Sequence, residues 1–130
     1  MFALDTNTLI HFFKGLGRVR DHLLATSPSE VAVPSVVLFE LEVGISQSGQ
    51  SSKRRAQLDT LLDAVTVLPL DLAAAKKAAE VASALRRAGT VIGPMDTLIA
   101  GIALRHGATL VTHNTGEFRR VRGLSLEDWY

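Results

Sequence analysis

The sequence contains no cysteine, which excludes disulfides, thiolate zinc sites and a cysteine nucleophile. Its four histidines are His11, His22, His106 and His113, and no two of them lie four residues apart. The zinc-protease signature, which needs two histidines at that spacing on one helix face, is therefore absent. The lack of cysteine also fits a reducing compartment.

Aromatic residues and long apolar runs are scarce as well. Only 5% of residues are aromatic, so aliphatic side chains must form the core, and a hydrophobic fraction of 47% supplies enough of them. No run approaches the roughly 18 apolar residues of a membrane span. The apolar N-terminal stretch has no preceding positive charge and is interrupted by Asp5, so it fails as a signal peptide. We expect one domain over residues 1–130 in a soluble, cytoplasmic protein.

Positive charge is not in excess, because the formal net charge is only +1. Basic residues nevertheless cluster at Lys53–Arg55, at Arg86 and Arg87, and at Arg119 and Arg120. Phosphate contacts are made one face at a time, so a local cluster matters more than the total charge. Two interpretations stay open for each cluster: a solvated helix surface, or a contact to a nucleic-acid backbone.

Short apolar runs alternate with longer helical patterns along the chain. The expected strands are residues 2–4, 31–33, 65–68 and 110–112, with a short last strand near 124–126. The expected helices begin at Thr6 or Asn7, Ser35, Ser52, Asp71 and Met95. Strands separated by helices imply parallel crossovers. We therefore predict an α/β fold in which helices flank a mostly parallel sheet of four to five strands.

The clearest helical pattern follows Asp71, which is placed to cap it, and ends at Gly89. Its polar face carries Lys76, Glu80, Ser83 and Arg87. The predicted inward face is Leu72, Ala75, Ala79, Ala82 and Leu85. Such an alanine-rich face permits close approach of the sheet or of a second subunit.

Several segments end in acidic or amide side chains where the predicted sheet has its carboxyl edge. Asp5 follows the first strand, and Thr112 and Asn114 lie at or just beyond the end of the fourth. Glu40 lies within an apolar helical stretch, and Asp96 lies in the first turn of a buried helix. In open parallel sheets, sites form beyond the carboxyl ends of the strands, so these groups are expected to converge.

Several buried carboxylates together repel one another unless a cation joins them. Magnesium prefers oxygen ligands and can neutralise charge on a phosphate under attack. Each acid also has a simpler explanation: Asp5 as a helix cap, Asp96 as a first-turn acid, and Asn114 as part of a turn. Helix geometry puts Glu40 and Glu42 on different sides, and the spacing alone leaves open which one faces inward.

The sequence resembles the PIN-domain nucleases over essentially its whole length, and most closely the VapC-type toxins of bacterial toxin–antitoxin pairs. Five motifs in the family's order carry the resemblance. They are Leu4–Asn7, SVVLFELEVG at 35–44, Ile92–Asp96 with Ile99–Gly101, LVTHNTGEF at 110–118, and GLSLEDW at 123–129. The resemblance implies a PIN-like three-layer fold.

The resemblance also implies a set of site residues. The family's metal-binding acids correspond to Asp5, Glu40 and Asp96, which favours Glu40 over Glu42. Many members have an aspartate where Asn114 stands, and close relatives pair that asparagine with an acid at the position of Glu117. We therefore expect Asn114 or Glu117 to complete the site. Thr112 is expected to bond within it, and Thr6 and Asn7 are expected to position Asp5 or the substrate.

What the family does supplies the remaining expectations. Members usually form homodimers, cleave RNA with magnesium or manganese, and are silenced by a cognate antitoxin that threads a peptide into the acidic pocket, at times in a larger complex. The most similar toxins cut tRNA. We expect Arg86, Arg87, Arg119 and Arg120 to flank the pocket and hold the RNA backbone.

Two other functions compete with this one. Haloacid-dehalogenase phosphohydrolases also begin with a strand that ends in Asp, but their second aspartate is replaced here by Asn7, and a suitable lysine is absent near Asp96. A catalytically inactive PIN-like module that binds RNA or protein is the other alternative. Degenerate members usually lose acids, whereas this chain keeps three and a plausible fourth.

Overall fold

Short aliphatic runs form the centre of the protein, which is described over residues 1–130 by a computed structural model. Five strands pair in the order β3-β2-β1-β4-β5, and every pair is parallel. Their bounds are β1 (Phe2–Leu4), β2 (Val31–Pro34), β3 (Thr66–Leu68), β4 (Thr109–Val111) and β5 (Leu126–Glu127). The predicted parallel sheet of four to five strands is confirmed.

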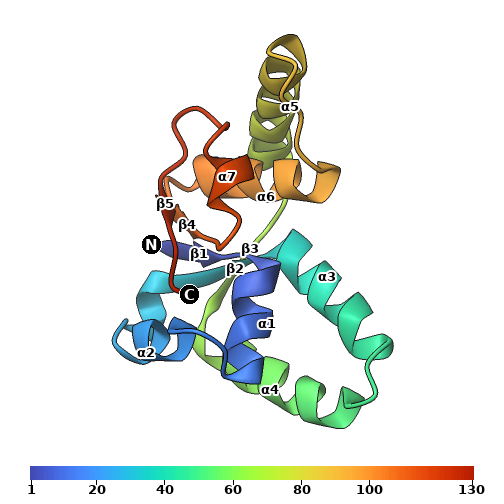
Figure 1. Ribbon diagram of the computed structural model, residues 1–130, viewed down its shortest axis with the longest axis vertical. Helices are drawn as coiled ribbons and strands as arrows, with labels where there is room; N and C mark the ends of the chain where they lie inside the picture. Colours follow the sequence, from blue (N-terminus) through green and yellow to red (C-terminus); the bar gives the residue numbers. More distant parts are fainter.

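Helices cover both faces of this sheet (Figure 1). They are α1 (Thr6–Lys14), α2 (Val19–Leu24), α3 (Ser35–Ser46), α4 (Ser51–Ala64), α5 (Leu72–Arg87), α6 (Pro94–Arg105) and α7 (Thr115–Phe118), with a 3₁₀ turn at Pro28–Glu30. In Figure 1, α5, α6 and α7 lie above the sheet, and α1, α2 and α4 lie below it. The expected three layers are therefore present. None of these helices combines the length and apolarity needed to cross a membrane.

Helix caps agree with the sequence at one position and differ at two. The Asp71 carboxylate accepts a hydrogen bond from the Ala74 amide at 2.8 Å, as predicted. The cap of α1 is Asp5 rather than Thr6 or Asn7, because Asp5 is still extended and accepts from the Thr8 amide at 2.9 Å. Ser35 does not cap α3; its hydroxyl instead accepts a hydrogen bond from the Leu70 amide at 3.0 Å, which ties α3 to the loop after β3.

The predicted inward face of α5 is wrong for most of its length. The buried side chains are Ala74, Ala78, Val81 and Leu85, while Leu72 is 72% exposed. The helix packs against α6, and any added Cβ at Gly101 of α6 would lie 2.6 Å from the Ala78 Cβ. Because of that close contact, the helix face that contains Ala78 is the buried one. The face that contains Ala75, Ala79 and Ala82 lines an open apolar groove of about 570 Å³ instead.

Candidate active site

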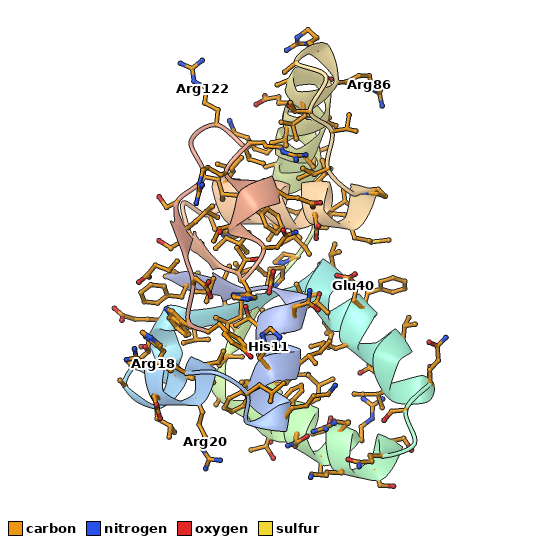
Figure 2. All side chains as sticks on the ribbon, viewed as in Figure 1. His11, Arg18, Arg20, Glu40, Arg86 and Arg122 are labelled. Carbon is orange, nitrogen blue, oxygen red and sulfur yellow. The ribbon has the colours of Figure 1, made fainter.

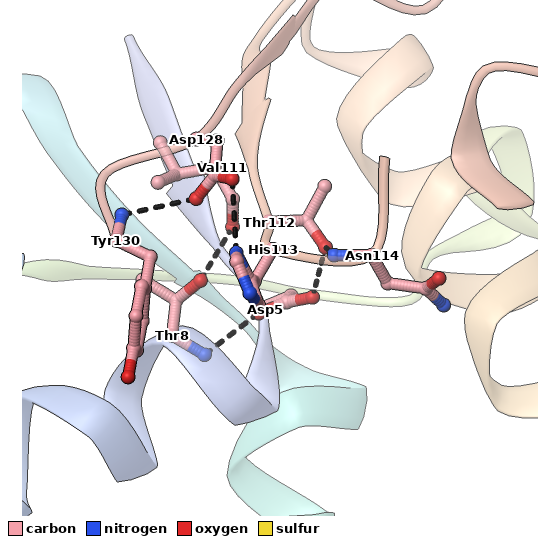
Figure 3. Close-up of polar contacts among 8 residues, drawn as sticks. All are labelled: Asp5, Thr8, Val111, Thr112, His113, Asn114, Asp128 and Tyr130. Carbon is pink, nitrogen blue, oxygen red and sulfur yellow. Dashed lines mark hydrogen bonds and ion pairs between the residues drawn. The ribbon is translucent and has the colours of Figure 1, made fainter. Parts of the chain in front are cut away.

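The carboxyl ends of β1 and β4 place Asp5 and Thr112 side by side (Figure 3). Leu4 pairs with Val111, and the next residue, Asp5, donates its amide to the Val111 carbonyl at 3.1 Å. The Thr112 hydroxyl donates to Asp5 Oδ2 at 2.5 Å, while Asp5 Oδ1 caps α1. Asp5 is only 5% exposed, so these bonds replace the water that it loses. Asp5 is thus both a helix cap and a member of the acidic group.

Glu40 reaches the same edge from α3, which begins directly after β2. Its Oε1 accepts a hydrogen bond from the Thr6 hydroxyl at 2.6 Å, so the first residue of α1 holds it. Glu42 forms a surface ion pair with Arg55 instead, at 2.5 Å. Of the two, Glu40 is the one that lies near the other acids, and Glu42 lies at the surface. The structure also assigns Thr6 to Glu40, whereas the sequence suggested that Thr6 positions Asp5 or substrate.

Asn114 and Glu117 extend this network into α7. The Asn114 amide donates to the Thr112 hydroxyl at 3.0 Å, and its side-chain nitrogen donates to Glu117 Oε2 at 3.1 Å. Hydrogen bonds therefore connect Asp5, Thr112, Asn114 and Glu117 in one chain. Asn114 brings no charge, but it orients the carboxylate that does.

Asp96 completes the group from the first turn of α6. Burial, and after it the negative charges of Asp5, Glu117 and Glu40, together raise its pKa from 3.8 to about 6. Carboxylates repel in this way only when they lie close together, so the raised pKa reflects four acids near one another at this edge of the sheet. The structure thus brings together the acids from four separate segments.

No basic side chain neutralises these four carboxylates. The ion pairs of the protein are Glu42 with Arg55, Lys77 with Glu80, Arg105 with Asp71, and His113 with Asp128. A set of carboxylate oxygens without a basic partner suits a hard divalent cation. The oxygens are not gathered into a coordination shell. Those of Asp5, Glu40 and Glu117 accept hydrogen bonds from neighbouring hydroxyl and amide groups.

The raised pKa of Asp96 predicts how the metal-free protein responds to pH. Its pKa is 3.8 unperturbed and about 6 when folded, so between these values the folded state binds more protons than the unfolded state. We expect the unfolding free energy of the wild type, relative to Asp96→Asn, to rise as the pH falls through about 6 towards 3.8. Chemical denaturation in chelator at several pH values measures this. A difference that stays constant with pH would contradict the assignment.

The remaining predicted residues lie outside this network. Asn7 is exposed, and its side chain makes no hydrogen bond. Arg120 donates to the Val91 carbonyl at 3.2 Å, beside the segment that leads to Asp96, and its neighbour Arg119 is exposed. Figure 2 shows Arg86 near the outer end of α5, on the side of the helix that lines the apolar groove, and Arg87 follows it. The structure does not bring Arg86 to the pocket.

Four residues beside the pocket were not predicted from the sequence: His11, His113, Asp128 and Tyr130. His113 lies between Thr112 and Asn114 in the sequence, and this position was the one signal that could have identified it. The other three reach it only through folding: the rings of His11 and Tyr130 contact the His113 ring, and Asp128 hydrogen-bonds to it.

A model of the PIN domain matches residues 2–124 of this chain. The chain belongs to the PIN-domain family. It is 35% identical to the tRNA(fMet)-specific endonuclease VapC of Shigella flexneri, over 98% of this chain and 97% of that protein. PIN-domain nucleases generally depend on divalent metals, which agrees with the unpaired carboxylates.

Solved structures of PIN-domain relatives agree with this assignment. The DNA-bound VapBC of Salmonella typhimurium contains a chain that superposes with a TM-score of 0.92 at 33% identity, over 99% of this chain and 98% of that one. VapBC-5 of Mycobacterium tuberculosis, from the VapBC family of toxin–antitoxin systems, gives a TM-score of 0.64 at 29% identity, over 75% and 79% of the two chains. The resemblance to PIN-domain, VapC-type proteins is confirmed, and the haloacid-dehalogenase alternative is wrong.

Proposed function

We propose that this protein is a magnesium- or manganese-dependent endoribonuclease that acts as the toxin of a toxin–antitoxin pair. One observation carries the proposal: Asp5, Glu40, Asp96 and Glu117 lie near one another at the carboxyl edge of the sheet, with no basic partner. The relatives named as VapC nucleases supply the reaction class, which is hydrolysis of an RNA phosphodiester.

The residues of the pocket have separable roles in this reaction. Asp5, Glu40 and Asp96 would hold the cation, and its Lewis acidity would activate water and neutralise charge on the phosphate. Thr112 and Thr6 fix the orientations of Asp5 and Glu40 through their hydroxyl groups. Asn114 aims Glu117 at the pocket, where that carboxylate supplies a fourth negative charge, directly or through water. The partial positive charge at the α6 N-terminus favours the ionised form of Asp96, and this partly offsets the repulsion from the other three acids.

We propose tRNA as the substrate and translation as the process that the cleavage inhibits. The support is the relative in Shigella flexneri, which is named for tRNA(fMet). Arg119 and Arg120 follow α7 directly, so they are the better placed of the predicted arginines to hold an RNA backbone beside the pocket. Arg86 and Arg87 lie farther along α5 and are weaker candidates.

The proposed partners are a cognate antitoxin and a second copy of the chain. The VapBC structures support the first, because they belong to a toxin–antitoxin family. The second is an expectation from the family, and the open groove beside Ala75, Ala79 and Ala82 of α5 is an apolar surface on which a copy could dock.

Incubation of the purified protein with total RNA tests the activity. We expect new RNA ends in magnesium or manganese and none in chelator, because the chelator removes the cation that activates water. Sequencing of these ends identifies the RNA and the cleavage position. A matched preparation of Asp5→Asn controls for contaminating nucleases. If the wild type with metal produces no ends beyond this control, the inactive-module alternative replaces the proposal.

A further inference from the structure

Three rings from distant parts of the chain meet beside the acidic pocket. His11 comes from α1, His113 follows β4, and Tyr130 follows β5. The centroids of His113 and Tyr130 are 4.5 Å apart with the ring planes tilted by 31°. The His11 ring contacts both edge-on, at 5.9 Å from His113 and 4.8 Å from Tyr130. His113 and Tyr130, the two outer rings, thus stack on each other, and His11 supports them from the edge.

One carboxylate holds both outer rings in place (Figure 3). Asp128 Oδ2 lies 2.9 Å from His113 Nδ1, and Asp128 Oδ1 accepts the Tyr130 amide at 2.9 Å. Tyr130 is also fixed from behind, since its carbonyl accepts the Arg18 amide at 2.7 Å. A Cβ at Gly17 would come within 2.8 Å of the Tyr130 ring, so the ring rests directly on that backbone. Rings held this firmly lose little conformational entropy when something stacks on them.

These rings are nevertheless open to solvent, and His113 lies next in the chain to two residues that bond the acids. The His113 side chain is 52% exposed and Tyr130 is 46% exposed. His113 stands between Thr112, which bonds Asp5, and Asn114, which bonds Glu117. A group that lies on the rings is therefore a close neighbour of whatever the acids act on.

Packing alone does not explain the exposure of these two rings. The neighbouring Trp129 shows what packing requires: it is 3% exposed and stacks on His22 with the planes 9° apart. It also contacts Phe2 at 5.2 Å. Trp129 thus anchors this end of the chain, while His113 and Tyr130 leave ring surface uncovered.

We infer that His113 and Tyr130 form a stacking platform for one nucleobase of the RNA substrate, next to the phosphate that is cleaved. The inference rests on the proposed function. Single-stranded RNA is commonly recognised by splayed bases that stack on aromatic or histidine rings, because every base has a π-face. The platform positions the substrate rather than taking part in bond breaking, so it acts on KM more than on kcat.

Abasic RNA provides the most direct test. A short RNA that spans the cleavage site mapped for the wild type is made with one abasic nucleotide at a time. Stacking on aromatic side chains is worth a factor of about 5 to 150 in affinity per base, so one abasic position next to the cut should raise KM by that much. If no abasic position raises KM, the inference is wrong.

Substitutions then connect that base to the rings. His113→Leu and Tyr130→Leu should raise KM for the intact RNA, and the sensitive abasic position should add nothing further in these variants. Tyr130→Phe keeps the ring and should raise KM less than Tyr130→Leu does. His22→Leu removes a ring that lies on Trp129, away from the acids, and should also leave KM unchanged. Thermal unfolding with and without metal shows that the variants fold and keep the cation site.

The outcomes separate this inference from the proposed function. A wild type that cuts no RNA contradicts the proposed function itself. A wild type that cuts RNA while the leucine variants keep its KM contradicts only the platform. Leucine variants that keep this KM but escape inhibition by a protein partner would assign the rings to that partner instead, and would also overturn the inference.

Discussion

Asp96→Asn should lower the rate of metal-dependent RNA cleavage by at least about 100-fold, because changes that only touch the neighbours of metal ligands already cost about 10- to 100-fold. The fold should survive, and the metal-free variant should be more stable than the wild type at neutral pH. The reason is that Asp96 is half-buried and is repelled by Asp5, Glu117 and Glu40. Cleavage rates and unfolding in chelator measure the two effects.

Glu42→Gln is the matched control for this prediction. Glu42 lies on the same helix as Glu40, but it is paired with Arg55 at the surface rather than facing the acids. We expect this variant to cleave RNA like the wild type. The cleavage rate of Thr6→Val should fall between the rates of Asp96→Asn and Glu42→Gln. This change leaves every acid in place and removes only the hydroxyl that holds Glu40. Equal loss in Glu42→Gln, or wild-type rates in Asp96→Asn, would contradict the assigned site.

Gly101→Ala should destabilise the protein by about 1–3 kcal/mol, although alanine is the better helix former. The added Cβ would lie 2.7 Å from the Ala78 backbone nitrogen and 2.8 Å from the Ala78 Cα. Backbone atoms cannot rotate away as a side chain can, so α5 and α6 would have to separate. Urea unfolding measures the loss, and pairing the change with Ala78→Gly should recover part of it.

Gly44→Ala is the control, because Gly44 is also a glycine within a helix. A Cβ there meets nothing within 4 Å. This variant should gain about 0.5–1 kcal/mol from helix propensity alone. A similar gain in Gly101→Ala would show that the two helices are not in the close contact described.

The sequence was sufficient for the class of fold. Strands alternating with helices predicted the parallel sheet, since period and turn signals are local properties that survive folding. The sequence also proposed Asp5, Glu40 and Asp96 as site residues, because acids stand out against apolar segments and match a family pattern. The Asp71 cap was equally local, as it depends on one side chain and an amide three residues on.

Tertiary structure decided the features that depend on partners far along the chain. The inward stripe of α5 was mispredicted because several alanine stripes are equivalent until Gly101 of α6 selects the one through Ala78. Thr6 holds Glu40 rather than Asp5, and Ser35 bonds Leu70 rather than its own helix, because packing brings those groups within reach. The cluster of His11, His113 and Tyr130 has no signature in the sequence, since α1, β4 and β5 bring the rings together only in the folded chain. Local patterns determine which elements form, and only packing determines which side chains meet.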